Sequence, residues 1–210
     1  QLIGGMSGEA RLRRFHGPRA ERLIDEIAWR GHALIAQRVA RYGIDCDLRY
    51  GYMDLALKPK HMRAFEERES ALRRLKFGDD VQLVSRSGIQ DFIASDAYIG
   101  GLLNRRNGHL HPLNLCLGEA RALTSLGSRI HEGTEATEIV HGNRPCVRTA
   151  RGDVEADFVV LAGDSYHRLE RSKLGGLMFP ARSFIIATEP LTETEIRTLD
   201  PQRLACSETI

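Results

Sequence analysis

Residues 158–161 form an uninterrupted apolar run, Phe-Val-Val-Leu, which limits the possible folds more than any other stretch of the chain. A short run of this kind is typical of a strand buried on both faces of a parallel sheet. Ala162 and Gly163 follow it, and small residues at the carboxyl end of such a strand leave room for a ligand. The run therefore predicts an α/β or α+β protein with a nucleotide-sized cleft at one sheet edge.

Three stretches have apolar residues at three- and four-residue steps, the period of an amphipathic helix. They are residues 18–42, 60–77 and 112–126. Each ends at a glycine, which takes the left-handed conformation of a helix cap without steric cost. The second stretch is so rich in Lys, Arg and Glu that we expect a solvated outer helix with a narrow apolar stripe.

The segments between the helices have the short, turn-bounded pattern of strands. Strands are expected near residues 45–57, 81–85, 129–130, 136–140, 146–149, 183–188 and 204–210. Residues 95–103 carry a patch of small residues that fits either a strand or a close approach of two backbones. Residues 129–149 should form a small antiparallel meander, with turns at 142–143 and 151–153. Residues 104–108 are polar and are expected to form a loop before the helix that Pro112 begins.

The balance of charges excludes several classes of partner. Thirty Lys and Arg face 28 Asp and Glu, so the chain lacks the strong basic field of a nucleic-acid-binding protein. No apolar run is long enough to span a bilayer, and no leader opens the chain, which favours a cytoplasmic protein. The four cysteines include no CxxC pair, and His109 and His111 have no further ligand at metal-binding spacing, so no metal site is predicted.

Both ends of the chain resemble the interior of a domain. The sequence begins with apolar, glycine-rich residues at 1–8 and stops at 204–210 without the polar taper that is usual of a terminus. We therefore expect a fragment of a longer protein.

Four separated motifs resemble one family, the D-amino-acid-oxidase-like FAD-dependent oxidoreductases. The motifs are Gly-His-Leu-His-Pro-Leu at 108–113, Gly-Ser-Arg-Ile-His-Glu-Gly-Thr-Glu-Ala at 127–136, Asp-Phe-Val-Val-Leu-Ala-Gly at 157–163 and Ile-Ile-Ala-Thr-Glu-Pro-Leu at 185–191. Residues 1–5 and 164–169 look closest to the gamma-glutamylputrescine oxidases and their relatives within it. The resemblance spans nearly the whole chain.

The resemblance implies a mixed α/β fold in which a Rossmann-like FAD-binding domain is interleaved with a mixed-sheet substrate domain. On that template residues 1–43 continue the FAD-binding domain and residues 44–104 belong to the substrate domain. Residues 105–170 return to the FAD-binding domain, and residues 171–210 return to an incomplete substrate domain.

The resemblance also implies which residues lie against FAD. Ala136 matches a strand position whose backbone meets the adenine, although valine is commoner there. Ala162 and Gly163 match the small pair that lets the backbone approach the cofactor, and Gln1 and Leu2 match the segment that passes along the isoalloxazine ring.

The glycine fingerprint of this family is absent. G-x-G-x-x-G holds the pyrophosphate at a helix N-terminus, and an acidic residue about 20 positions later binds the ribose. Gly4, Gly5 and Gly8 do not supply that spacing. The chain alone is therefore expected to bind FAD weakly or not at all and to be inactive.

The activity implied by the resemblance is oxidation of a small amine, with gamma-glutamylputrescine as the best guess, in putrescine catabolism. The amine becomes an imine, which water hydrolyses to aldehyde and ammonia, and oxygen or another acceptor takes the electrons. The protein must orient the amine against the flavin, so aromatic walls matter more than an acid–base pair. The alternative is a cofactor-free binding or assembly module that keeps the shape of the substrate domain.

Four residues are candidates for the substrate side of the site. Tyr50, Tyr52 and Tyr98 could be aromatic walls, although a tyrosine on a half-buried strand more often serves packing. His109 precedes a helix that should run near the flavin, and a structural role is at least as probable for its neighbour His111. No residue is assigned as catalytic.

Overall fold

The computed structural model describes residues 9–74, 78–164, 169–170 and 184–208. The elements are α1 (Glu9–Tyr42), β1 (Arg49–Ala56), α2 (Pro59–Arg74), β2 (Val81–Ser85), β3 (Gly100–His109), α3 (Pro112–Ser125), β4 (Ala136–Val140), β5 (Cys146–Thr149), β6 (Gly152–Glu155), α5 (Glu193–Leu199) and β7 (Ala205–Glu208), with single 3-10 turns at Gly78–Asp80 and Ile89–Asp91. They form two compact units, Gln1–Ser128 with Glu189–Ile210, and Arg129–Thr188. The mixed α/β class is confirmed.

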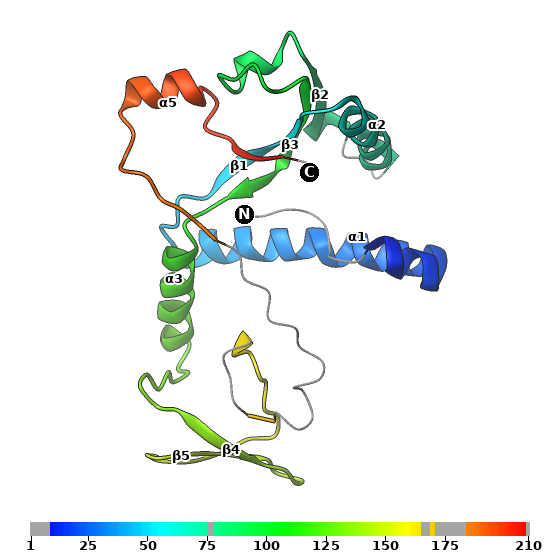
Figure 1. Cartoon of the computed structure of the whole chain (residues 1–210). Helices are drawn as coiled ribbons and strands as arrows, with labels where there is room; N and C mark the ends of the chain where they lie inside the picture. Colours follow the sequence, from blue (N-terminus) through cyan, green and yellow to red (C-terminus); the bar gives the residue numbers. More distant parts are fainter. Residues whose placement is uncertain (1–8, 75–77, 165–168, 171–183, 209–210) are drawn as a thin grey trace. The chain divides into compact units, whose positions relative to one another are not determined.

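The first unit is built on a four-stranded mixed sheet with the order β2-β3-β1-β7 (Figure 1). β1 pairs antiparallel with β3 on one edge and parallel with β7 on the other. β2 pairs antiparallel with β3 at the outer edge. β1 is therefore an interior strand, and its last six residues are all buried.

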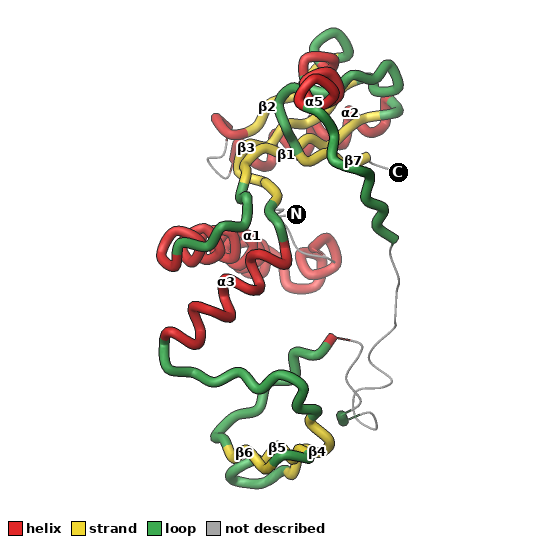
Figure 2. Tube along the Cα trace, turned by 90° about the vertical axis from the view of Figure 1, so that its left-hand side faces the viewer, coloured by secondary structure: helices red, strands yellow, loops and turns green. Residues whose placement is uncertain are grey.

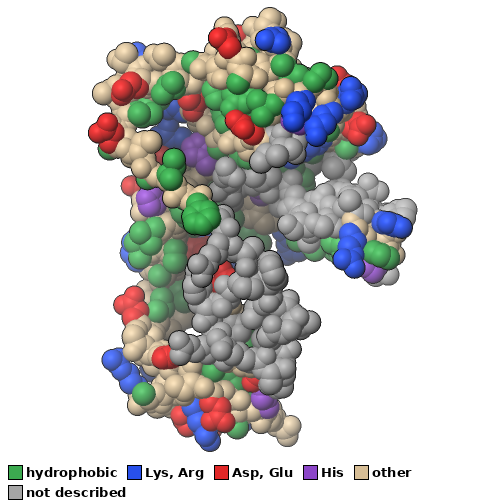
Figure 3. All heavy atoms as spheres, in the orientation of Figure 1, with side chains coloured by type: hydrophobic (Ala, Val, Ile, Leu, Met, Phe, Trp, Pro, Cys, Tyr) green, Lys and Arg blue, Asp and Glu red, His purple; other side chains and the backbone are tan. Residues whose placement is uncertain are grey.

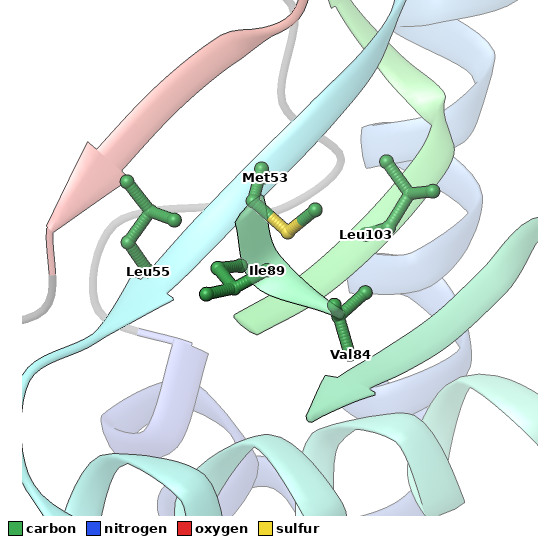
Figure 4. Close-up of a cluster of buried hydrophobic side chains, with 5 residues drawn as sticks. All are labelled: Met53, Leu55, Val84, Ile89 and Leu103. Carbon is green, nitrogen blue, oxygen red and sulfur yellow. The ribbon is translucent and has the colours of Figure 1, made fainter. Parts of the chain in front are cut away.

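One face of this sheet carries the larger apolar cluster. Met53 and Leu55 of β1, Leu103 of β3, Val84 of β2 and Ile89 pack together, each at most 4% exposed (Figure 4). Alternation along each strand places these side chains on one face. The other face is the one that α2 covers.

Helix α2 lies against the second face through a narrow apolar contact. Phe65 is buried with Ala56, Val81 and Leu102 of the three strands β1, β2 and β3. Only His61 and Phe65 of α2 are buried, and Lys and Arg side chains gather over the helix in Figure 3. The prediction of a charged outer helix with a thin apolar stripe is confirmed.

Helix α1 is longer at its amino end than predicted and is broken at Gly17. This residue has φ 61° and ψ −154°, which interrupts the helical backbone, and the second stretch begins at Pro18 as the sequence indicates. Helix α3 contacts α1: Arg38 pairs with Glu119 at 3.0 Å, and Gly118 leaves space for Ile44.

The second unit contains the predicted meander. β4, β5 and β6 pair antiparallel in sequence order, as the tube of Figure 2 shows. β4 and β5 were expected, whereas β6 falls on residues 152–155, which overlap the expected turn at 151–153. Gly152 has φ 139°, so it makes the turn and begins the strand together.

Residues 104–108 are not a loop, and this prediction was wrong. They belong to β3, which runs from Gly100 to His109 and has a β-bulge between Asn104 and Gly108. Asn104 explains the difference, because its side-chain oxygen accepts hydrogen bonds from the backbone N–H groups of Arg106 (3.0 Å) and Asn107 (3.4 Å). A polar segment can therefore stay in a strand, its amides being satisfied locally.

Three predicted strands are absent among the described residues. Residues 129–130, 158–161 and 184–188 have no regular structure, and Phe158, Val160 and Ile185 are between 84% and 94% exposed. An apolar run becomes a buried strand only when neighbouring strands pair with it and other elements cover its faces. Within the part of the chain that is described, no strand pairs with any of the three.

Helix α5 was not predicted, although its start has a recognisable signature. Thr192 and Glu195 form a reciprocal capping box, in which the Thr192 hydroxyl accepts from the Glu195 N–H and the Glu195 carboxylate accepts from the Thr192 N–H. β7 confirms the strand expected near residues 204–210.

Gly108 of β3 tests this packing. A Cβ at Gly108 would overlap the backbone carbonyl oxygen of Arg49, which cannot rotate away. We expect Gly108→Ala to lower the free energy of unfolding by about 1–3 kcal/mol, as overpacking does. The urea midpoint followed by far-ultraviolet circular dichroism measures the change.

Gly31→Ala is the matched control, because a Cβ at this helical position meets nothing within 4 Å. Replacing a helical glycine by alanine should raise stability by up to about 1 kcal/mol. Equal midpoints for Gly108→Ala and the unchanged chain would show that β1 and β3 are not packed as described.

Candidate functional site

The residues expected to contact FAD have different surroundings. Ala136 is the first residue of β4 and is half-buried, paired with Thr149 of β5. Ala162 and Gly163 are exposed and lie in irregular backbone. Gln1 and Leu2 lie outside the described residues. Their contacts with FAD stay predictions.

Tyr50 and Tyr52 lie on the same strand but in opposite environments. Tyr52 is 2% exposed and belongs to the core, where packing accounts for it without a ligand. Tyr50 is 52% exposed and lines a cavity. Of the two, Tyr50 alone presents its ring to a space that a small molecule could enter.

Tyr98 donates a hydrogen bond to Glu208 Oε1 at 2.5 Å and packs beside the larger apolar cluster. The bond to Glu208 raises the pKa of Tyr98 to about 12, because deprotonation would break it and put two negative charges together; burial adds to the effect. Nearby, burial raises the pKa of Cys206 to about 11. Both groups are protonated at neutral pH, so Cys206 is not a thiolate nucleophile there.

The two histidines of the Gly-His-Leu-His-Pro motif have different partners. His111 is the N-cap of α3, and its Nδ1 accepts from the Asn114 N–H at 3.2 Å, which is a structural role. His109 ends β3, and its Nδ1 is buried without a partner among the described residues. His109 therefore remains a candidate for a ligand contact, and His111 is explained by capping.

The candidate site is the cavity that Tyr50 lines, a space of about 280 Å³ between α1 and the sheet. Its walls are Trp29, His32, Ala33 and Ala36 from α1, Tyr50 from β1, and Arg105 and Arg106 from β3. The four helix residues stand at steps of three and four, which places them on one face. Aromatic rings, small apolar side chains and two guanidinium groups thus meet in one cavity.

A β-bulge points both arginines into this cavity. Tyr50 pairs with Gly108 and Tyr52 with Asn104, so β1 advances two positions where β3 advances four. Bulges re-aim side chains and often lie beside functional sites. Asn104 holds the bulge through its bonds to the amides of Arg106 and Asn107. Both arginines are consequently exposed while Asn107 is fully buried.

The cavity was missed from the sequence, apart from Tyr50. The expected loop at 104–108 hid Arg105 and Arg106, because charged residues in a loop are ordinary. Trp29 and His32 are three positions apart on a predicted helix, which shows that they share a face but not which strands they meet. The pairing of β1 with β3 is what brings these segments together.

The described parts of the chain contain neither a metal-binding cluster nor a membrane-spanning helix. No group of three or more His, Cys, Asp or Glu side chains there could hold a metal ion. None of the helices described is both long and apolar enough to span a membrane.

The Tyr98–Glu208 pair predicts a response to alkali. Folded Tyr98 keeps its proton to about pH 12, whereas an unfolded tyrosine loses it near pH 10, so stability should fall as pH rises through this window. In Glu208→Gln we expect the tyrosinate absorbance of Tyr98 to appear at lower pH and the loss of stability to be shallower. Spectrophotometric titration and urea midpoints measure both.

Glu67→Gln is the matched control, since Glu67 is an exposed carboxylate on α2 in the same unit. It should leave the tyrosine titration unchanged. An identical titration in Glu208→Gln and the unchanged chain would contradict the hydrogen bond.

Comparison with known proteins identifies the family. Residues 3–208 match the model of the DAO family, FAD dependent oxidoreductase. Gamma-glutamylputrescine oxidoreductase of Escherichia coli K12 is 34% identical over 206 residues, which are 96% of this chain and 48% of that protein. A probable oxidoreductase, OrdL, of Haemophilus influenzae is 38% identical over 167 residues, 76% of this chain and 38% of that protein.

Solved structures show the same fold at lower sequence identity. Glycine oxidase from Geobacillus kaustophilus superposes with a TM-score of 0.61 at 21% identity, covering 72% of this chain and 43% of that one. L-proline dehydrogenase from P. horikoshii gives 0.59 at 17% identity, covering 68% and 39%. The chain spans about half the length of the first curated relative, 48%, and less of the others. It belongs to the DAO family of FAD-dependent oxidoreductases.

Proposed function

We propose that this chain is part of an FAD-dependent oxidoreductase acting on a small amine, with gamma-glutamylputrescine as the best candidate substrate. The observation that carries the proposal is the match to gamma-glutamylputrescine oxidoreductase, which is 34% identical over 96% of this chain. The four sequence motifs resemble the family in their order and spacing, and residues 1–5 and 164–169 resemble the gamma-glutamylputrescine oxidases. Oxygen or another acceptor would take the electrons, and the chain would act within a longer polypeptide.

The residues present fit part of an FAD site. Ala136 offers strand backbone with a small side chain, and Ala162 and Gly163 offer exposed backbone that a cofactor can approach closely. Gln1 and Leu2 would complete the flavin side. The pyrophosphate-binding fingerprint must come from outside these residues, because Gly4, Gly5 and Gly8 lack its spacing.

Bound FAD would supply the two-electron acceptor, and the chain would bind and orient the amine. Removal of a hydride equivalent and a proton from the carbon and nitrogen of the amine leaves an imine, and water then gives the aldehyde and ammonia. Tyr50 is the substrate-side candidate with the most exposed ring, and His109 has a free buried nitrogen to offer. Their role would be to orient the amine and exclude water.

A visible spectrum tests the cofactor assignment. The longest reading frame that carries these residues should purify with the absorbance of oxidised flavin, whereas the 210-residue chain should retain little. Gly163→Val in the longer protein should lower flavin occupancy severalfold, because a branched side chain keeps the backbone from the cofactor. Gly142→Val is the control, since a Cβ there meets nothing within 4 Å.

An amine panel tests the substrate. Oxygen uptake should be highest with gamma-glutamylputrescine and lower with glycine, sarcosine and D-amino acids, although one methylene changes preference by only about 1–3 kcal/mol. A folded, colourless long protein that takes up no FAD would favour the cofactor-free binding module instead. A flavoprotein that prefers another amine would keep the cofactor assignment and overturn the substrate.

A further inference from the structure

The cavity between α1 and the β3 bulge has a charge that its own walls do not neutralise. Arg105 has no carboxylate within ion-pair distance among the described residues. It donates to the amide oxygen of Gln82 at 3.5 Å, the outer limit of a hydrogen bond. Arg106 pairs with Asp80 at 3.5 Å and lies over the Trp29 ring at 5.2 Å. No Asp or Glu is among the residues that line the cavity, whereas two arginines are.

The imidazole ring of His32, in the wall of the same cavity, makes no hydrogen bond among the described residues. His32 lines the cavity, and both of its nitrogens are buried without a partner in the described structure. Buried polar atoms in native proteins almost always have a partner, so this ring has hydrogen-bonding capacity that the described residues leave unused. At least one ring nitrogen of any His tautomer can donate to an anion.

The other residues that line the cavity indicate what kind of molecule carries the anionic group. Ala33 and Ala36 are small and apolar, and Trp29 and Tyr50 add aromatic rings to the lining. A planar carboxylate matches the fork of a guanidinium through two parallel hydrogen bonds, and a short aliphatic stem matches an apolar wall. A cavity of about 280 Å³ holds a molecule of this size with room for a few waters.

We propose that this cavity binds a short-chain carboxylate, with Arg105 as the main anchor, Arg106 and His32 as further donors, and the aromatic rings beside its stem. The Asn104-stabilised bulge positions Arg105 for this contact. The proposal does not depend on amine oxidation, because every residue that lines the cavity belongs to α1, β1 or β3 of this chain.

Trp29 is a built-in reporter, since it is the single tryptophan of the chain and lies in the wall of the site. Sodium butyrate added to the 210-residue chain at constant ionic strength should change the Trp29 emission in a saturable way, because Arg106 shifts over the ring when it engages an anion. Butyramide has the same shape without the charge and should give no saturable change.

Single substitutions test whether Arg105 is the main residue that binds the carboxylate. Arg105→Gln should weaken butyrate binding about tenfold or more, the size expected for a hydrogen bond to a charged group. Tyr50→Phe, which keeps the ring, should bind butyrate within about twofold of the unchanged chain if the ring supplies only a surface. Arg86→Gln is the matched control, because Arg86 is exposed in the turn after β2, at the far end of the β2–β3 pair. Far-ultraviolet circular dichroism confirms that each variant is folded.

Three outcomes would overturn the proposal: equal responses to butyrate and butyramide, undiminished binding in folded Arg105→Gln, or a phosphate response as strong as that of butyrate. The last would indicate a general anion site. Since the butyrate titration uses no flavin and the visible-spectrum assay uses no carboxylate ligand, failure of one leaves the other result intact.

Discussion

The carboxylate of Asp54 joins the three elements on which the first unit depends. It lies on β1, is 9% exposed, and accepts from Arg68 of α2 at 2.8 Å and from Ser207 of β7 at 3.0 Å. A buried carboxylate is costly unless it is paired and hydrogen-bonded, so removing either partner leaves an unfavourable charge in the sheet. The contact fixes where α2 crosses the sheet and which residue of β7 faces β1.

On the sheet face that α2 covers, apolar and polar contacts have different roles. Phe65 buries apolar surface against Ala56 and Leu102, which is favourable but tolerant of small sliding movements. The Arg68–Asp54 pair has a defined geometry and is therefore sensitive to position. Together they let a helix with only two buried residues remain in a single place on the sheet.

Sequence periodicity predicted the helices and strands whose formation is signalled by nearby residues. The helices at 18–42 and 112–126 and the strands at 81–85 and 136–140 have apolar spacing and boundary residues that act locally. The strand expected at 158–161 is different, since an apolar run is a strand only if partners exist for it. Its pattern is compatible with a buried strand, but no strand among the described residues pairs with it, and Phe158 and Val160 are exposed.

The candidate site also depends on strand pairing that the sequence does not reveal. The four sequence motifs predicted the DAO family, and the sequence also made Tyr50 a candidate for an aromatic wall of the site. Arg105 was not predicted to line the site. The direction of its side chain depends on a β-bulge, which is a shift in register between two strands and cannot be recognised in the sequence of either strand alone. The Asn104 side chain that supports it is recognisable only once its partner amides are known.

The parallel pairing of β1 with β7 has a consequence for the order of folding. Asp54 and Ser207 are 153 residues apart in sequence, and the second unit lies between them. Closing so long a loop costs conformational entropy before the contact can repay it. During synthesis β1, β3 and β2 can associate early, while one edge of β1 stays open until nearly all of these residues have left the ribosome. An open edge of this kind invites pairing with other chains, so the interval before β7 arrives is the period of greatest aggregation risk.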